Sequence, residues 1–361
     1  ISGVYAYPGT PSTEITEYIQ HHPVAQERNI HREWSANEKT ALEAALGMSY
    51  AGKRSMACMK HVGLNVAADV FMNSAITGVN GGLVVTVADD PSQHSSQNEQ
   101  DSRFYGKFAM IPVFEPSDQQ EAYDMTYAAF DFSEKTGLPV LMRVPTRLAH
   151  SRSGVVPKPL KEEHGLKLPE NLMQFMLLPA FGRKYYQDLL DKQEMLLEQS
   201  EQSGWNNYFE GADKSLGVVC CGIAYNYLME NYPEGKCPYP VVKISHYPVP
   251  RKMLSKLESQ CDELLVVEEG YPLVEELLTD FFGKGTRVSG RLNGALPRKG
   301  ELNPDHVAKA LGKEVHSAWE NPGSLVGRPP SLCAGCGHQD TYQTLNEVIR
   351  DVGEGRVFSD I

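Results

Sequence analysis

Two cysteines near the end of the chain form its sharpest chemical pattern. Cys333 and Cys336 are separated by two residues, and no second CxxC occurs among the seven cysteines. Two thiolates at this spacing can bind two corners of an iron–sulfur cluster, bind Zn²⁺, or act as a redox pair. Either metal site would need ligands from outside this stretch of chain. The odd number of cysteines favours a reducing cytoplasm over a disulfide framework.

The segment 7–13 follows a short apolar run and precedes a predicted helix. In open α/β sheets ligands bind at the carboxyl ends of strands, and a helix N-terminus offers free N–H groups to an anion. Pro8 and Gly9 would hold this loop rigid, and Thr10 would offer a hydroxyl to a ligand. A plain turn that ends in a helix cap explains the same residues, and the local sequence alone favours that simpler interpretation.

The same arrangement recurs at 60–65, after a strand predicted over 56–59. It places Lys60, His61 and Asn65 around Gly63, at another loop between a strand and a helix. A lone histidine is more often structural than functional. The structural and the ligand-binding interpretation therefore stand about even for this loop.

A long polar segment, 89–103, follows the run 83–88, which is wholly apolar as is typical of a buried parallel strand. It ends at Arg103. Loops on a rigid scaffold often carry function, whereas the alternative is a solvated loop with a helical turn. Its acidic residues and histidine lack the spacing of metal ligands, so we do not expect a metal site here.

Glu38 stands at the start of a helix that we predict to end near Gly52. The run Ser35 to Glu38 fits a capping box, with Glu38 at the N3 position, where a carboxylate is stabilising for local reasons. The functional alternative is a buried carboxylate that hydrogen-bonds a cofactor. Desolvation would raise its pKa, so that it could hold a proton near neutral pH. Taken alone, the residue favours the capping interpretation.

Two residues near the C-terminal end could bind a diphosphate and its metal ion. His338 opens a predicted helix whose N-terminus is well placed for a phosphate. Asp360 ends a predicted strand, a natural position for a carboxylate that holds Mg²⁺ against a diphosphate.

Strand and helix patterns divide the chain into domains. Their alternation over 1–150 predicts a parallel sheet with helices on both faces. Residues 151–212 break this alternation and hold one long predicted helix, 183–202, so we interpret them as a connecting segment. The alternation resumes over 213–318 as a second, smaller α/β domain, and a third domain begins at 328–361 and is incomplete.

The composition is that of an acidic globular protein. The 361 residues include 34 basic and 46 acidic side chains, a formal net charge of −12. Nucleic acid is excluded as the main partner, because binding it needs a basic surface. No apolar run approaches the ~20 residues that span a bilayer, so we expect no membrane association. The chain starts with Ile1 rather than Met, and we expect both ends to be cuts in a longer protein.

Five segments occur in an order that points to one family. They read YPGTPST, EWSANEK, MKHVGLNVAADV, NGGLVVTVADDPSQHSSQNEQDSR and RPPSLCAGCGH. In this order they closely resemble the alpha subunit of the indolepyruvate:ferredoxin oxidoreductases, in the 2-oxoacid:ferredoxin oxidoreductase family, over essentially the whole chain. The resemblance implies a multi-domain α/β fold, with 1–150 as the pyrimidine-binding thiamine domain, 213–318 as a transketolase-C-like domain and 328–361 as the start of the diphosphate-binding domain.

The resemblance also implies an activity. Such enzymes oxidatively decarboxylate aryl 2-oxoacids, with indolepyruvate and phenylpyruvate as the default substrates. Thiamine diphosphate with Mg²⁺ serves the decarboxylation, [4Fe-4S] clusters pass electrons singly to ferredoxin, and coenzyme A takes the acyl group. A beta subunit as partner, a dimer of heterodimers and a cytoplasmic location are further implications.

Residue roles follow from the resemblance position by position. Glu38 matches the catalytic glutamate that contacts the aminopyrimidine of thiamine, and Thr10 matches a threonine near the substrate carboxylate. We add His61 and, as an extrapolation, Arg103 as substrate ligands. The metal ligands implied are Cys333 and Cys336 for the cluster and Asp360 for Mg²⁺. The remaining residues of the implied cofactor site are Pro8, Gly9, Gly63, Asn65 and His338.

The chain departs from the family pattern in two places. Gly337 and His338 follow the cysteine pair, as in pyruvate and 2-oxoglutarate relatives, where much of the indolepyruvate group has proline. Ser359 replaces a glycine before Asp360. The substrate therefore stays open to another 2-oxoacid, and a non-redox thiamine-dependent decarboxylase is a second alternative.

Overall fold

The computed structural model describes residues 1–279, 287–315, 323–325 and 337–353. The chain divides into two units, Ile1–Val315 and His316–Ile361. The contacts thus divide the chain near Val315 and not between the two sheets of the first unit, and the three-domain division stays a prediction.

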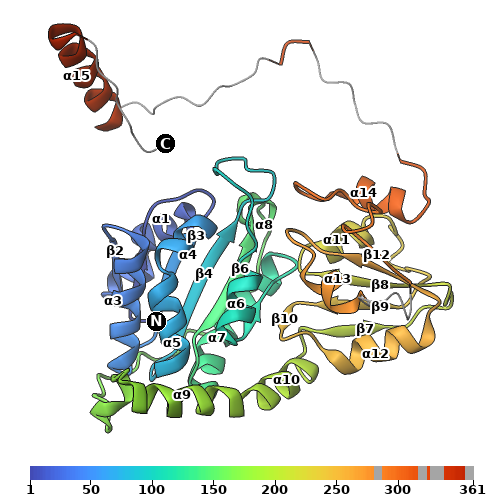
Figure 1. Ribbon diagram of the computed structural model, residues 1–361, viewed down its shortest axis with the longest axis horizontal. Helices are drawn as coiled ribbons and strands as arrows, with labels where there is room; N and C mark the ends of the chain where they lie inside the picture. The colour runs from blue at the N-terminus through green and yellow to red at the C-terminus, as the bar shows by residue number, and fades with distance from the viewer. Residues whose placement is uncertain (280–286, 316–322, 326–336, 354–361) are drawn as a thin grey trace. The chain divides into compact units, whose positions relative to one another are not determined.

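The first sheet has seven strands in the order β10-β5-β6-β4-β3-β1-β2 (Figure 1). All of its pairings are parallel except that of β10, which runs antiparallel to β5. Its strands are β1 (Gly3–Ala6), β2 (His31–Trp34), β3 (Ser55–Lys60), β4 (Leu83–Asp89), β5 (Val113–Phe114), β6 (Val140–Pro145) and β10 (His246–Tyr247). The apolar strand predicted over 83–88 is confirmed as β4, and all seven of its residues are buried.

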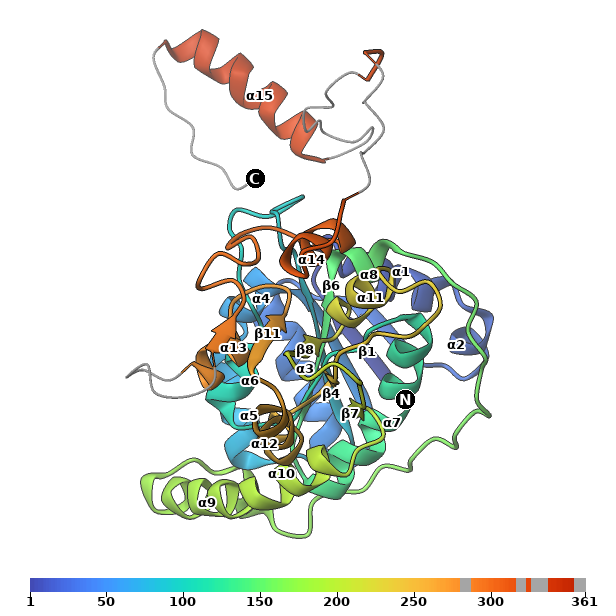
Figure 2. The same cartoon turned by 90° about the vertical axis from the view of Figure 1, so that its right-hand side faces the viewer.

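Helices cover both faces of this sheet, as the strand–helix alternation predicts (Figure 2). One face packs against α3 and α5, and the other against α1 and α7. The helices of this part are α1 (Thr13–His21), α2 (Pro23–Glu27), α3 (Glu38–Tyr50), α4 (His61–Val66), α5 (Ala68–Thr77), α6 (Arg103–Ala109), α7 (Gln119–Thr136) and α8 (Thr146–His150). Two glycines in the left-handed region, Gly78 and Gly137, end α5 and α7.

The connecting segment contains two helices where the sequence predicted one. A short 3-10 turn, η1 (Leu172–Phe175), precedes α9 (Pro179–Asp191) and α10 (Gln193–Glu201), which meet at Lys192. Figure 1 shows them running along one edge of the unit, where α9 contacts α5 and α10 contacts α12. The prediction of a single helix over 183–202 is wrong, because the helix is interrupted at Lys192, between the part that contacts α5 and the part that contacts α12.

The second sheet has five strands in the order β12-β11-β8-β9-β7. Only β7 is antiparallel to its neighbour. The strands are β7 (Asn207–Phe209), β8 (Leu216–Cys221), β9 (Val241–Ile244), β11 (Glu263–Val267) and β12 (Arg287–Ser289), with α11 (Ala224–Met229), α12 (Arg251–Gln260), α13 (Leu273–Leu278) and α14 (Pro304–Ala310) around them. One hydrophobic cluster continues from the first sheet into the second, through side chains such as Val113, Tyr247 and Leu254.

In the second unit the structure describes one long helix, α15 (Gly337–Val352). It confirms the helix predicted after the cysteine pair and places His338 in its first turn. Cys333, Cys336 and Asp360 lie outside the described residues. In the described part of the chain, no helix combines the length and apolar character needed to cross a membrane.

Candidate functional site

Three loops meet at the carboxyl edge of the first sheet. Strands β1, β3 and β4 are parallel neighbours, so the segments that follow them, 7–12, 60–63 and 90–102, emerge at the same edge. Gly9 in the first loop lies against Lys60 in the second, where a β-carbon on Gly9 would stand 3.3 Å from Cβ of Lys60. This edge is where open α/β sheets bind their ligands.

Glu38 begins α3, which starts next to this edge. Asn37 caps the helix by accepting a hydrogen bond from the N–H of Thr40 at 2.9 Å. Glu38 therefore occupies the first helical position, and the predicted capping box with Ser35 as cap and Glu38 at N3 is wrong. Because Asn37 already does the capping, the carboxylate of Glu38 is left for another role.

The carboxylate of Glu38 lies over Gly63, in the first turn of α4. A β-carbon on Gly63 would come within 2.5 Å of Oε1 and 2.6 Å of Cγ of Glu38, so only glycine leaves room for the side chain. Burial raises the pKa of Glu38, although a hydrogen bond from its own backbone N–H acts against the shift. The site therefore holds a carboxyl group that keeps a proton to higher pH than an exposed glutamate.

The loop 7–12 is folded on itself by hydrogen bonds around Gly9. The carbonyl of Gly9 accepts from both the N–H and the hydroxyl of Ser12, at 2.8 and 2.7 Å, and its N–H donates to Oγ1 of Thr13 at 2.8 Å. Ser12 is the N-cap residue of α1, yet its hydroxyl makes no capping bond. Pro8 and Thr10 are exposed, so the Thr10 hydroxyl is open to a ligand.

His61 is buried at the start of α4, directly after β3. Its Nε2 lies 3.2 Å from the carbonyl oxygen of Asn98, and its Nδ1 has no hydrogen-bond partner among the described residues. Asn65, one helical turn on, is exposed and accepts a hydrogen bond from the hydroxyl of Tyr105 at 2.6 Å. The structure thus brings Gly9, Gly63 and His61 to one edge, next to Glu38.

The loop after β4 is an ordered part of this edge, and Figure 1 shows it extending beyond the strands. Asp90 is buried and accepts hydrogen bonds from the N–H groups of His94 and Ser95 and the hydroxyls of Ser96 and Thr146. Tyr271, which follows β11 of the second sheet, donates its hydroxyl to the carbonyl of Glu99 at 2.7 Å. Hydrogen bonds thus tie this loop to the edge, while most of its side chains over 92–98 are exposed to solvent.

Arg103 does not lie where a substrate ligand would. Its side chain is fully enclosed and forms ion pairs with Asp101 at 2.5 Å and Glu268 at 2.8 Å. It also donates to the carbonyl oxygens of Glu269 and Tyr271. With its donors used by protein groups, the guanidinium has none to offer a substrate carboxylate. We correct the interpretation of Arg103 from substrate ligand to structural residue.

Arg143 extends this buried network between the two sheets. It pairs with Asp89 at 2.6 Å and with Glu115, and it donates to the carbonyl of Glu269 at 2.9 Å. Burial raises the pKa of Glu269 to about 7, because the hydrogen bond from the N–H of Leu302 only partly offsets desolvation. The charges in this layer join the two sheets.

The sequence placed Lys60 and Asp90 in these loops but assigned no role to either, and both are buried ionisable residues at the same edge. A lysine directly after the predicted strand 56–59 and next to His61 was the sequence feature that could have indicated a role in the site.

No group of three or more potential metal ligands occurs among the described residues.

A family model identifies the part of the chain that forms this site. The model for pyruvate flavodoxin/ferredoxin oxidoreductase, thiamine diphosphate-binding, matches residues 2–202. The chain belongs to this family. All three loops and Glu38 fall within the matched residues of the oxidoreductase family.

Curated relatives agree with this family assignment. The chain is 40% identical to indolepyruvate oxidoreductase subunit IorA of Archaeoglobus fulgidus, over 99% of this chain and 59% of that protein. It is 41% identical to subunit IorA of Pyrococcus abyssi, over 96% of this chain and 56% of that protein. The chain therefore spans a little more than half the length of these relatives.

Solved structures show the fold of the family. The 2-oxoglutarate:ferredoxin oxidoreductase of Magnetococcus marinus matches with a TM-score of 0.63 at 14% identity, over 86% of this chain and 62% of that chain. A split gene transketolase matches with a TM-score of 0.50 at 15% identity, over 86% of this chain and 91% of that chain. The predicted α/β thiamine-diphosphate-binding fold class is confirmed.

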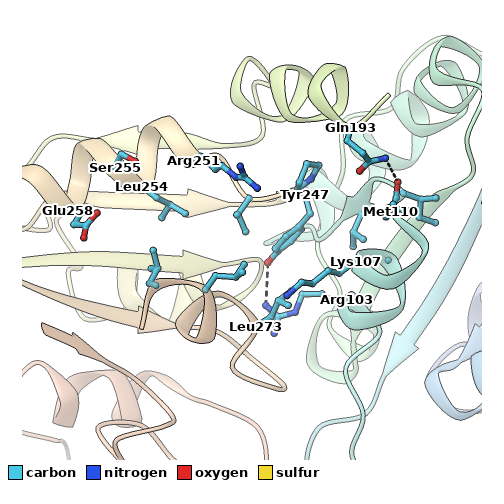
Figure 3. Close-up of a pocket in the computed structure, with 17 residues that line it drawn as sticks. Arg103, Lys107, Met110, Gln193, Tyr247, Arg251, Leu254, Ser255, Glu258 and Leu273 are labelled. Atoms are coloured by element: carbon cyan, nitrogen blue, oxygen red, sulfur yellow. Dashed lines mark hydrogen bonds between the residues drawn. The ribbon is translucent and has the colours of Figure 1, made fainter. Parts of the chain in front are cut away.

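A separate cavity lies between the two sheets of this family member (Figure 3). It has a volume of about 510 Å³ and is lined by α6, α10, α12 and α13, largely with apolar side chains such as Met110, Leu254 and Leu273. No residue of the segments 7–12 or 60–65 lines it. The cavity is therefore distinct from the edge that carries Glu38.

Proposed function

We propose that this chain carries the pyrimidine-binding half of the thiamine site in an oxidoreductase that decarboxylates aryl 2-oxoacids, such as indolepyruvate and phenylpyruvate. The observation that carries the proposal is the carboxyl of Glu38 held over Gly63 at the carboxyl edge of a parallel sheet. The names of the relatives support the aryl substrates. The acyl group would pass to coenzyme A.

The residues at the edge fit thiamine diphosphate. Glu38 is a half-buried carboxyl with a raised pKa, the kind of group that can share a proton with a ring nitrogen of the aminopyrimidine. Gly63 leaves the space that this carboxyl occupies. When bound, thiamine diphosphate supplies the electron sink for the loss of CO₂.

Other residues of the edge would position the reactants. Pro8 and Gly9 lie in a loop in which the carbonyl of Gly9 accepts a hydrogen bond from the hydroxyl of Ser12. Asn65 lies on α4 and is exposed. The exposed hydroxyl of Thr10 and the unpartnered Nδ1 of His61 are the proposed polar contacts for the substrate.

The redox and metal parts of the proposal rest only on the resemblance of single residues to the family pattern, outside the residues 2–202 that the family model matches. Cys333 and Cys336 would bind a [4Fe-4S] cluster that passes electrons to ferredoxin. Asp360 would hold Mg²⁺, and His338 would contact the diphosphate. A beta subunit, a dimer of heterodimers and a cytoplasmic location complete the proposal.

Glu38→Gln tests the proposal in the full-length protein with its partner subunit. The variant keeps the shape of the side chain but cannot exchange the proton, so 2-oxoacid-dependent reduction of a viologen dye should fall by about 10²- to 10⁴-fold. Glu43→Gln, an exposed residue on the same helix, is the matched control and should keep the wild-type rate. Wild-type rates in Glu38→Gln would refute the catalytic assignment.

A further inference from the structure

Lys60 is a buried cation at the centre of the candidate site. It ends β3, between β1 and β4, and only 8% of its surface is exposed. Its ammonium group donates to the carbonyl and hydroxyl oxygens of Ser95, both neutral acceptors. Among the described residues no carboxylate forms an ion pair with it. A buried charge without a counter-ion is costly, so its presence needs an explanation.

The one nearby carboxylate does not neutralise this charge. The negative charge of Asp90 acts on Lys60, but burial is the larger influence and lowers the pKa of the lysine. Asp90 is already held by four donors of its own loop and of α8. The positive charge of Lys60 is thus only partly compensated within this chain.

The surroundings of Lys60 are those of a ligand site. Its aliphatic stem lies against Gly9, where a β-carbon would be 3.3 Å from Cβ and 3.6 Å from Cδ of the lysine. The next residue is His61, whose Nδ1 has no hydrogen-bond partner among the described residues. Gly63, three residues after Lys60, contacts the side chain of Glu38. An ammonium group has three N–H donors, and the two oxygens of Ser95 accept from two of them, so one donor remains for a ligand.

We propose that Lys60 binds the carboxylate of the 2-oxoacid substrate, an inference that rests on the proposed function. A substrate carboxylate at this position neutralises the part of the positive charge of Lys60 that Asp90 does not compensate. Lys60 thereby takes the role that was assigned to Arg103 only by extrapolation. It makes the site selective for anionic 2-oxo compounds over neutral ones of the same shape.

A structural role is the competing explanation, since Lys60 also ties the loop after β4 to β3 through Ser95. A residue that only holds the loop would change the turnover number or the stability. It would not change the preference for a charged over a neutral ligand. The test therefore measures that preference directly.

The experiment uses the full-length protein with its partner subunit and two competitive inhibitors, 3-phenylpropionate and its amide. Lys60→Gln should raise the inhibition constant of the carboxylate and the KM of phenylpyruvate by about 10- to 100-fold, and leave the amide unchanged. Lys60→Arg keeps the charge and should keep most of the preference. Lys39→Gln, an exposed lysine beside Glu38, should behave as the wild type.

Two further variants keep the test decisive. Lys60→Met preserves the stem against Gly9 and replaces Lys60→Gln if that variant loses thiamine binding or thermal stability. Ser95→Ala removes only the hydroxyl contact and should leave the preference intact. An unchanged preference for the carboxylate in Lys60→Gln or Lys60→Met overturns the inference. If the wild-type complex reduces no dye with any 2-oxoacid, the proposed function itself fails, which is a different outcome.

Discussion

The carboxylate of Glu38 and the α-carbon of Gly63 are in such close contact that a single methyl group cannot be placed between them. The two residues come from different elements, the first turn of α3 and the first turn of α4. The contact fixes the direction of a carboxyl group whose pKa burial raises. The candidate site therefore depends on a glycine as much as on an acid.

Gly63→Ala should displace Glu38 and lower kcat/KM for 2-oxoacid-dependent dye reduction by about 100-fold, because misplacing a reacting group by about 1 Å has that effect. The matched control is Gly47→Ala on α3, where a β-carbon meets nothing within 4 Å. It should keep the wild-type rate and stabilise the helix by about 0.5–1 kcal/mol. Equal rates in both variants would show that the Glu38–Gly63 contact is not needed.

Arg103→Met should unfold the protein more easily and not weaken substrate binding selectively. Removing the guanidinium leaves Glu268 buried without its cationic partner and Asp101 with Arg143 alone, which costs about 3–5 kcal/mol. The thermal midpoint checks this, with the exposed Lys107→Met on the same helix expected within about 0.5 kcal/mol of the wild type. A raised KM at an unchanged midpoint would restore Arg103 as a substrate ligand.

Glu269 should make the stability depend on pH. Its pKa rises from the ordinary 4.5 to about 7 on folding, so the folded state keeps a proton that the unfolded state releases. The free energy of unfolding should therefore fall as the pH rises from about 4.5 to 7, by about 3 kcal/mol in total, and stay level above.

Glu269→Gln should remove this dependence, because a neutral amide can still accept from Leu302 and contact Tyr227. Urea unfolding of both proteins from pH 4.5 to 8 measures the difference between their stabilities. Parallel curves over that range would contradict the assignment, and the exposed Glu258→Gln is the control.

Cys333→Ser and Cys336→Ser should each lower the iron content and the cluster absorbance of the anaerobically purified full-length protein. Cys237→Ser is the control: burial raises the pKa of this half-buried thiol, which makes it a poor ligand. Unchanged iron in the double variant would remove these cysteines from the proposed electron path.

Much of the first sheet could be predicted because its elements are encoded locally. The apolar run 83–88 became the fully buried β4, and the segments 7–12 and 60–63 follow strands as expected. Glu38 was found through its resemblance to a family glutamate. Its local pattern indicated a cap, which the structure assigns to Asn37.

The sequence by itself therefore determined the parallel α/β architecture, the family and the loops that carry the candidate site, since each depends on residues a few positions apart. Only the tertiary structure decided which charged side chains are available to bind a substrate. Arg103 forms an ion pair with Glu268 across 165 positions of the chain, whereas the hydrogen bonds of the Lys60 ammonium group to described residues go to the neutral oxygens of Ser95. Pairings at such separations leave no local pattern, because they form only when the two sheets pack together.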